Sequence, residues 1–420
     1  MQRRQCLNAL AAGAALMVPL GRHGWAATAV AAGGTDVDAA PTARKLIVVM
    51  LRGAVDGLHV VAPFGDANYA RLRPTIALAP PGSPDGVLDL DGYFGMHPAL
   101  APLLPLWRER QLAFVHASGS PDATRSHFDA QDYMESATPG VKSTADGWMN
   151  RLLASLPGPS RPTRALSIGP VMPRILSGRA AAVNLANGAA GTRAGALERP
   201  QMGDAFDRLY ADHARFGHAY RDARMARQDV LAAALPTPAM RAIDGGAPLP
   251  NGFPDDAARL ATLMRNDANI QLGFFALGGW DTHASQGAGK GQLANRLAPL
   301  AQGLAVLARR LGPLFDDTVI VVMSEFGRTA RENGTGGTDH GHGNVMWVLG
   351  GRVAGGAVLG DWHGVGDGAL NEGRDVPVTT DFRTVLAQIA ERHVRLPDSA
   401  LERVFPGAPV GGSPLTLLRG

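Results

Sequence analysis

The sequence predicts an α/β fold with three layers, in which helices cover both faces of a mostly parallel sheet. Short, unbroken apolar runs recur along the chain, which is typical of strands buried on both faces. Helical segments alternate with these runs, as the crossover connections of a parallel sheet require. The 420 residues are 45% hydrophobic and 18% charged, so the chain can bury the core of one large domain.

The apolar pattern predicts the individual elements. Six strands are expected, at 46–51, 112–117, 165–168, 271–277, 319–323 and 345–349. Five helices of the main domain are expected, at 98–110, 126–136, 148–156, 293–311 and 382–393. The Pro-rich stretch between the first strand and the first helix is irregular, with a short hairpin near Ile76 and Val87.

We expect one domain over residues 45–410, with a helical insertion at about 178–267. The insertion would contain helices at 201–220, 225–235 and 255–265, joined by loops rich in Gly and Pro. We interpret it as a lid or a wall of the domain. Residues 33–44 are small and rich in Gly and Ala, which is typical of a flexible leader.

Residues 1–32 predict a twin-arginine export signal, because the pair Arg3 and Arg4 precedes an apolar stretch and several small residues. The alternative is a buried N-terminal helix. The apolar stretch at 9–20 is too short to span a bilayer, so no stable membrane anchor is expected once the signal is removed. The signal predicts a periplasmic or secreted protein, with the twin-arginine (Tat) machinery as its export partner.

Charge and cysteine content narrow the function. The formal charge is +3, from 40 basic and 37 acidic residues. Removing Arg3, Arg4 and Arg22 with the signal leaves 37 of each, which gives no support to nucleic-acid binding. The single cysteine, Cys6, lies in the signal, so a metal in the mature chain must bind to oxygen or imidazole ligands. Such ligands suit zinc, magnesium, calcium or manganese.

Four predicted strand ends carry acidic or imidazole side chains: Asp56; Asp281 and His283; Glu325; and His340 and His342. Strand ends of one parallel sheet can meet at one edge, so these groups predict a site for one or two divalent cations. Residues two apart on extended backbone point the same way, which favours both histidine-containing pairs. Each has a structural alternative: a turn residue for Asp56, an ion pair with Arg328 for Glu325, and loop hydrogen bonds for the late histidines.

Further candidates lie at the start of the helix expected at 126–136. Ser126 is either a helix cap or, because free N–H groups there attract anions, a group at an anion site. His127 is a candidate metal ligand or base. Arg125 and Arg328 could bind an anionic substrate with two hydrogen bonds each, and surface ion pairs are the alternative for both.

Five motifs together resemble the exported bacterial proteins grouped as domain of unknown function 1501, which belong to the alkaline phosphatase and sulfatase superfamily. The motifs are LRGAVDGL, TRSHFDAQDYME, GGWDTH, SEFGRT and GTDHGHGN, and the resemblance runs from Lys45 to Phe405. It implies an alkaline phosphatase-like fold. It also implies that Ser126 is the nucleophile and that Asp56 binds one metal.

The resemblance further implies that Asp281, His283 and either His340 or His342 bind the second metal. Where the superfamily has an Asp-His pair, this chain has Glu325-Phe326, so one imidazole is missing. We expect the second histidine of the late pair to replace it.

The resemblance implies a metal-dependent hydrolase that acts on a small anionic phosphate or sulfate ester, with Ser126 attacking as an alkoxide. Zinc is the first choice of metal. The sequence around Ser126 lacks the motif from which sulfatases make formylglycine. One alternative is a non-catalytic exported protein with a degenerate site, which the missing imidazole favours. Another, a Ser/His/Asp hydrolase, lacks a Gly-x-Ser-x-Gly elbow.

Overall fold

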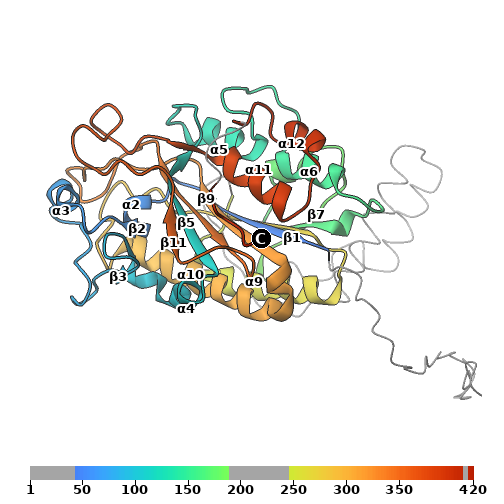
Figure 1. Cartoon of the computed structure of the whole chain (residues 1–420), viewed down its shortest axis with the longest axis horizontal. Coiled ribbons are helices and arrows are strands. Elements are labelled where there is room, and N and C mark those ends of the chain that lie inside the picture. The colour runs from blue at the N-terminus through green and yellow to red at the C-terminus, as the bar shows by residue number, and fades with distance from the viewer. Residues whose placement is uncertain (1–42, 189–245, 410–414) are drawn as a thin grey trace, which may run out of the picture. The chain divides into compact units, whose positions relative to one another are not determined.

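A computed structural model describes residues 43–188, 246–409 and 415–420 (Figure 1). The predicted export signal and almost all of the leader lie outside the described residues, as do the helices predicted at 201–220 and 225–235. Within the three described ranges, no helix combines the length and the apolar character needed to cross a bilayer.

The main sheet is centred on strand β1 (Lys45–Leu51). On one side β1 pairs in parallel with β8 (Leu272–Leu277), which is followed by β6 (Ala165–Ile168) and β7 (Val183–Leu185). On the other side β1 pairs in parallel with β9 (Thr318–Ser324). This half of the sheet is entirely parallel, as the sequence predicts.

The other half contains the one strand of the main sheet, within the described residues, that runs against its neighbours. β10 (Asn344–Leu349) is antiparallel both to β9 and to β5 (Leu112–Gly119). β11 (Ala357–Leu359) and β12 (Thr380–Asp381) then pair in parallel with β5. All six predicted strands are present, and the sequence analysis missed β7, β11 and β12, which are only two or three residues long.

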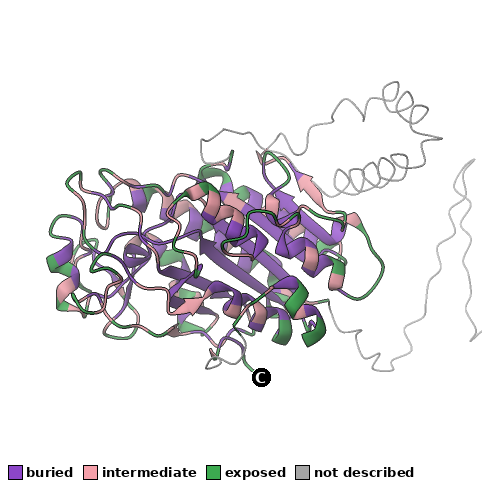
Figure 2. Ribbon diagram, turned by 90° about the horizontal axis from the view of Figure 1, so that it is seen from above, coloured by how far each residue is buried: buried purple, intermediate pink, exposed green. Residues whose placement is uncertain are grey.

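Helices cover both faces of the sheet, because the strands bury side chains in both directions. Ile47, Val49 and Leu51 of β1 face one hydrophobic cluster, and Leu46 faces the other. The first cluster is covered by the helices 98–103, α4 (Leu104–Arg108), α9 (Phe253–Asn266) and α10 (Gln292–Leu311). The second is covered by α6 (Trp148–Ser155), α11 (Phe382–Arg392) and α12 (Asp398–Val404). Figure 1 shows these groups on opposite sides of the sheet, and Figure 2 shows the buried strands between them.

A small second sheet lies beside the start of the domain. Its order is β2 (Val61–Ala62), β4 (Gly95–Met96) and β3 (Leu88–Asp89), all antiparallel. The hairpin predicted near Ile76 and Val87 is present only directly after Val87, where β3 and β4 pair, and Ile76 lies in no strand. The turn between β3 and β4 is held by Asp91, whose carboxylate accepts hydrogen bonds from the backbone of Tyr93 and Phe94.

Short helices connect the larger elements. They are α2 (Gly57–Val60), α3 (Ala67–Leu72), and the 3₁₀ helices Pro98–Leu103, Pro162–Arg164, Arg174–Leu176, Pro250–Gly252 and Gly312–Asp317. The two described ends of the predicted insertion belong to the main domain, since β7 extends the sheet and α9 packs on α10. The buried face of α9, which includes Phe253, Leu260 and Met264, explains that packing.

Candidate metal centre

The topology brings four chain segments to one edge of the sheet. Leu51 at the end of β1 lies opposite both Leu277 at the end of β8 and Ser324 at the end of β9. The loops that follow these three strands therefore begin side by side. Because β10 is antiparallel, its first residues lie at this edge too, and the loop between β9 and β10 leaves and returns there.

Helix α5 (His127–Ser136) adds the residue that completes the cluster. Its position is fixed by Glu135, whose carboxylate accepts a 2.6 Å hydrogen bond from Arg52 after β1 and another from the backbone of Ile175. The first residue of the helix, His127, then lies over Phe326, with ring centroids 4.9 Å apart. The helix is thus tied to the end of β1, which places one imidazole at the edge of the sheet.

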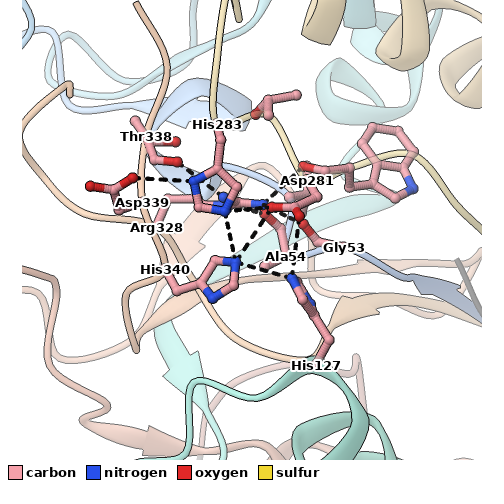
Figure 3. Close-up of polar contacts among 12 residues, drawn as sticks. Gly53, Ala54, His127, Asp281, His283, Arg328, Thr338, Asp339 and His340 are labelled. Carbon is pink, nitrogen blue, oxygen red and sulfur yellow. Dashed lines mark hydrogen bonds and ion pairs between the residues drawn. The ribbon is translucent and has the colours of Figure 1, made fainter. Parts of the chain in front are cut away.

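Three imidazoles and one carboxylate converge at this edge (Figure 3). The Nε2 atom of His340 lies 3.1 Å from Nε2 of His127 and 3.0 Å from Nε2 of His283. Asp281 Oδ1 lies 3.1 Å from Nε2 of His283 and 3.4 Å from Nε2 of His340. Its Oδ2 lies 3.6 Å from Nε2 of His127. The ligand atoms of His127, Asp281 and His340 all lie within 4.8 Å of one another, which makes them a candidate metal-binding group.

The outer nitrogen of each imidazole faces an oxygen that can only accept a hydrogen bond. These oxygens are Glu325 Oε1 at 2.8 Å from His127, Asp339 Oδ1 at 3.1 Å from His283, and the Arg125 carbonyl at 3.0 Å from His340. Each Nδ1 must therefore carry a proton. In a neutral ring the other nitrogen, Nε2, is then an unprotonated lone pair.

The Nε2 lone pairs of His127 and His283 thus each face Nε2 of His340, beside the Asp281 carboxylate, and these groups repel unless a cation lies among them. A proton or a metal ion can fill that role. In a tetrahedral zinc site, with Zn–N distances of about 2.0–2.1 Å, ligand nitrogens are about 3.3 Å apart. The spacings of 3.0 and 3.1 Å between Nε2 atoms are close to that value. Imidazoles whose Nδ1–H is held by an oxygen are also the usual arrangement around a metal, so the residues fit a divalent cation.

The charges at the site favour the ionised carboxylates. Burial opposes ionisation of Asp281, but hydrogen bonds from His127, His340 and Arg328 hold the pKa of its carboxyl well below the ordinary value. Burial likewise opposes ionisation of Glu325, and the hydrogen bond from His127 lowers its pKa. Burial lowers the pKa of His127, but the Asp281 and Glu325 carboxylates outweigh it and raise that pKa to about 9. Without a metal, His127 therefore carries the proton that joins the cluster.

Glu325 contacts the cluster only through His127. It is completely buried, and its oxygens accept hydrogen bonds from the backbone N–H of Gly53, from Gln131 Nε2 and from Ser324 Oγ. Its carboxylate is fully occupied in holding the imidazole and the loop after β1. The structure therefore gives Glu325 a positioning role where the sequence analysis expected a metal ligand.

Gly53 shows how closely the loops at this edge approach one another. Its φ of +118° is a conformation that side chains rarely adopt, and a Cβ there would lie 2.7 Å from the backbone nitrogen of Asp281. Only glycine allows the loop after β1 to support both Glu325 and the loop after β8.

Asp56 is not part of the cluster, in contrast to the prediction. Its carboxylate forms two hydrogen bonds with Arg73, of 2.6 and 3.0 Å, and accepts a third of 2.7 Å from Gln286. Both members of the ion pair are about 1% exposed or less. A guanidinium already neutralises this carboxylate, so Asp56 has no free oxygen to offer a metal.

The two arginines predicted to bind substrate have other partners. Arg328 is buried, and its guanidinium donates to the carbonyls of Gly53, Ala54 and Thr338 and to Asp281 Oδ1 at 2.5 Å. It therefore holds three loops together and cannot reach a substrate. Arg125 pairs with Glu372 and Asp375, and its backbone carbonyl is the group that orients His340.

Only one histidine of the late pair reaches the cluster. Nε2 of His342 lies 3.0 Å from the carbonyl of Ser120, away from the other imidazoles. The prediction that this second histidine replaces the imidazole missing at Phe326 is wrong. The third imidazole of the cluster is that of His127, which comes from a helix start and not from a strand end.

Ser126 precedes His127 as the N-cap residue of α5. Ser126 is exposed, and its hydroxyl makes no capping hydrogen bond. The side chain therefore does not cap the helix, which was the structural alternative for this residue. The sequence analysis missed Asp339, although it stands beside His340 in the same Gly-rich motif. It also missed a pocket of about 280 Å³ that adjoins the cluster through Asp339 and is lined by Arg331 and Arg374, among others.

Comparison with known proteins gives a family and a set of weak structural likenesses. The model of the family described as "Protein of unknown function (DUF1501)" matches residues 107–405. No curated protein matches the sequence.

Among solved structures, Ps i-CgsB bound to k-i-k-neocarrahexaose is 11% identical, with a TM-score of 0.39 over 84% of this chain and 72% of the other. A putative sulfatase from Bacteroides fragilis is 8% identical, with a TM-score of 0.37 over 89% and 80%. The C-terminal periplasmic domain of EcEptC from Escherichia coli, in complex with zinc, is 11% identical, with a TM-score of 0.35 over 74% and 73%. These scores are all below 0.5, so any function must be argued from the site of this chain.

Proposed function

Since the chain belongs to the DUF1501 family, which is described only as of unknown function, we propose a function from its candidate metal centre: an exported, metal-dependent hydrolase of phosphate or sulfate esters. The observation that carries the proposal is the set of three imidazoles whose outer nitrogens are all held by acceptor oxygens. Such a set directs the Nε2 atoms of His127 and His283 at Nε2 of His340, and His127, His340 and Asp281 bring their ligand atoms within 4.8 Å of one another.

The proposed ligands are His127, His283, His340 and Asp281. Three nitrogens and one oxygen suit zinc better than magnesium or calcium, which prefer oxygen ligands; manganese is the next candidate. A cation bound there would supply a Lewis acid that polarises a phosphoryl or sulfuryl oxygen and lowers the pKa of a coordinated hydroxyl. We propose one cation, because Arg73 already neutralises Asp56.

Ser126 is the proposed nucleophile. Its hydroxyl is exposed, has no capping role and belongs to the residue directly before His127. The start of the ten-residue helix α5 also presents free backbone N–H groups and the positive end of the helix dipole. An anionic ester beside Ser126 would be stabilised by this end of the helix.

The pocket beside the cluster is the proposed site for the rest of the substrate. Arg374 donates to the carbonyl of His340 and remains 42% exposed, and Arg331 is exposed on the same pocket. These two cationic side chains share the pocket with Glu332 and Asp339, and we propose that they bind the anionic group of a small ester. The volume of about 280 Å³ limits the substrate to a small molecule.

The second candidate function is a non-catalytic exported protein with a degenerate site. Its main support was the imidazole missing at Phe326, and His127 now fills that place. Elemental analysis separates the two proposals: a hydrolase retains about one equivalent of metal after purification, whereas a degenerate site retains none.

A substrate screen tests the reaction itself. Purified mature protein is assayed against phosphate monoesters, phosphate diesters and sulfate esters, before and after chelation and with zinc restored. We expect turnover that chelation removes and zinc restores. In the variant Ser126→Ala we expect metal to be retained and turnover to be lost, which separates the nucleophile from the metal ligands. Failure of every ester class with a full metal site contradicts the proposed reaction but not the metal centre.

Export by the twin-arginine machinery, to the periplasm or the medium, completes the proposal. The support is the pair Arg3 and Arg4 before the short apolar stretch. Replacing both with lysine should leave the protein in the cytoplasm of a fractionated host. Export that is unaffected by this change would contradict the twin-arginine route.

A further inference from the structure

A second charged pocket lies at the opposite edge of the sheet from the candidate metal centre. It has a volume of about 300 Å³, and its lining includes Arg44, Arg352, Arg392, Arg395, Arg419 and His393. Arg44 directly precedes β1, and Arg352 follows β10, which runs toward this edge. The seven residues of β1, at about 3.3 Å per residue, separate the two edges by roughly 20 Å.

Positive charge in this pocket exceeds the negative charge that accompanies it. Asp317 forms an ion pair with Arg44 and a second, at 3.9 Å, with Arg352. Arg419 donates to two backbone carbonyls and gains no counter-charge from them. Five guanidinium groups thus line the pocket, and its lining within the described residues includes no acidic side chain.

Two of the guanidinium groups have no partner within the described part of the chain. Arg392 and Arg395 lie at the end of α11 and just after it, and both side chains are exposed. No hydrogen bond or ion pair within the described residues uses either guanidinium. Like charges held this close repel, and a bound anion would remove that repulsion.

His393 provides an independent sign of a missing ligand. It is 2% exposed and lines the pocket between the two unpartnered arginines in sequence. Its Nε2 lies 3.0 Å from the carbonyl of Lys45 and must donate, so Nδ1 is an acceptor, and that atom is buried with no hydrogen-bond partner. Burial lowers the pKa of His393 to about 4, so the ring is neutral near pH 7. The pocket thus has donors on several sides and one acceptor at its wall.

We propose that this pocket binds the phosphate groups of a polyanion, at a site separate from the metal centre. Guanidinium groups match phosphate oxygens with two parallel hydrogen bonds, and five of them in one pocket suit more than one phosphate. The phosphates belong either to a free polyphosphate compound or to an anionic lipid headgroup.

Titration calorimetry with sodium tripolyphosphate tests the pocket. The experiment uses mature protein carrying Asp281→Asn, so that binding through a metal ion does not contribute, and the pocket variants show which remaining binding belongs to this pocket. We expect saturable binding that weakens as salt is raised. The double variant Arg392→Gln with Arg395→Gln should bind roughly tenfold more weakly or worse, because charge-assisted hydrogen bonds are lost. Both side chains are exposed and unpartnered, so the fold should be unaffected.

The matched control is Arg161→Gln with Arg179→Gln. Both control arginines are exposed, neither lines the pocket, and the protein loses the same two charges. We expect the control to bind as tightly as the parent. Equal weakening in control and test variants would overturn the proposal, because binding would then reflect net charge alone.

Sedimentation with vesicles identifies the source of the phosphate. Vesicles of phosphatidylglycerol are compared with vesicles of phosphatidylcholine, with the same two double variants. Variant-sensitive binding to the anionic vesicles, with weak binding of tripolyphosphate, assigns the pocket to a lipid headgroup. The reverse pattern assigns it to a soluble polyphosphate. Absence of binding in both experiments overturns the proposal.

Discussion

Two carboxylates that follow strands of the same sheet have opposite surroundings. Asp56, after β1, is enclosed by donors: Arg73, Gln286 and the His59 ring surround its oxygens, and it is about 1% exposed. Asp281, after β8, is 37% exposed and shares its space with imidazole nitrogens. The first region contains its own cation, and the second presents acceptors that need one from outside.

The difference teaches that the end of a strand does not by itself make a ligand site. What decides is whether another part of the chain already supplies a positive charge. Arg73 comes from an irregular, Pro-rich stretch and fully pairs with Asp56. Arg328 does reach Asp281, but it divides its donors among several acceptors and leaves Oδ2 facing His127.

The largest effect is expected around Asp56, where Arg73 already neutralises the carboxylate, and it is an effect on stability. Replacing Arg73 with methionine leaves an unpaired, buried carboxylate, so we expect the free energy of unfolding to fall by about 3–5 kcal/mol. Chemical denaturation measures this. The exposed Arg331, replaced in the same way, should change stability by less than about 0.5 kcal/mol. Equal stability of the two variants would mean that the Arg73–Asp56 ion pair does not stabilise the fold.

Around Asp281, in the candidate metal centre, we expect a substitution to weaken metal binding and to leave the fold intact. Asp281→Asn keeps an oxygen for Arg328 but removes the negative charge from the cluster. Metal affinity should fall by about a hundredfold or more, measured by competition with a chelating dye. The control is Asp367→Asn, since this residue is 82% exposed. Unchanged affinity in Asp281→Asn would remove this carboxylate from the proposed ligand set.

The next prediction tests whether Glu325 positions His127 or binds the metal directly. Glu325→Gln keeps the shape of the side chain but removes the charge that faces Nδ1 of His127. We expect metal affinity to fall by about 10- to 100-fold, without loss of stoichiometry. Asp339→Asn should have a smaller effect, because that carboxylate is half exposed. A complete loss of metal in Glu325→Gln would make this residue a direct ligand after all.

The smallest expected effect on stability is a dependence on pH. Burial lowers the pKa of His127, but its two carboxylate partners raise it to about 9, above the ordinary value of 6.5. This group therefore stabilises the metal-free fold fully below pH 6.5, and that contribution is lost as the pH rises through about 9. We expect the Tm of metal-free protein to fall over this range.

Metal binding should show the opposite trend, because the cation must displace the proton on His127. Apparent affinity should rise by about tenfold per pH unit between pH 6 and 8 if one proton is displaced. Affinity that is flat with pH would show that His127 is already unprotonated in the metal-free protein.

Much of the fold could be predicted from the sequence, because strands buried on both faces leave an unbroken apolar run. The runs at 46–51 and 319–323 correspond to β1 and β9 within one residue at each end. The direction of β10 could not be predicted, since an apolar run reads the same for a parallel or an antiparallel strand. The short strand β11 is half-buried and is held by pairing with β5, which leaves no local pattern.

The site was less accessible to sequence analysis than the fold. Periodicity suggested that His340 and His342 point the same way, but the chain bends between them. Gly341 and Gly343 donate to the backbone of different segments, at Gly327 and Val376, so the two imidazoles face different partners. His127 was named as a candidate metal ligand or base, but its place in the cluster could not be predicted, because nothing in a helix start indicates which strand end it will face.

The residues of the cluster come from segments that lie far apart in the sequence, and this determines when a metal ion can bind during folding. His127 and His340 are 213 positions apart, and β1, from the beginning of the domain, lies between β8, which precedes Asp281 and His283, and β9, which precedes the loop of His340. No early fragment of the nascent polypeptide holds all four groups, so the cation can enter only after long-range strand pairing is complete. Under twin-arginine export, which moves proteins already folded, the choice of metal would fall to the cytoplasmic pool and not to whatever ions the destination offers.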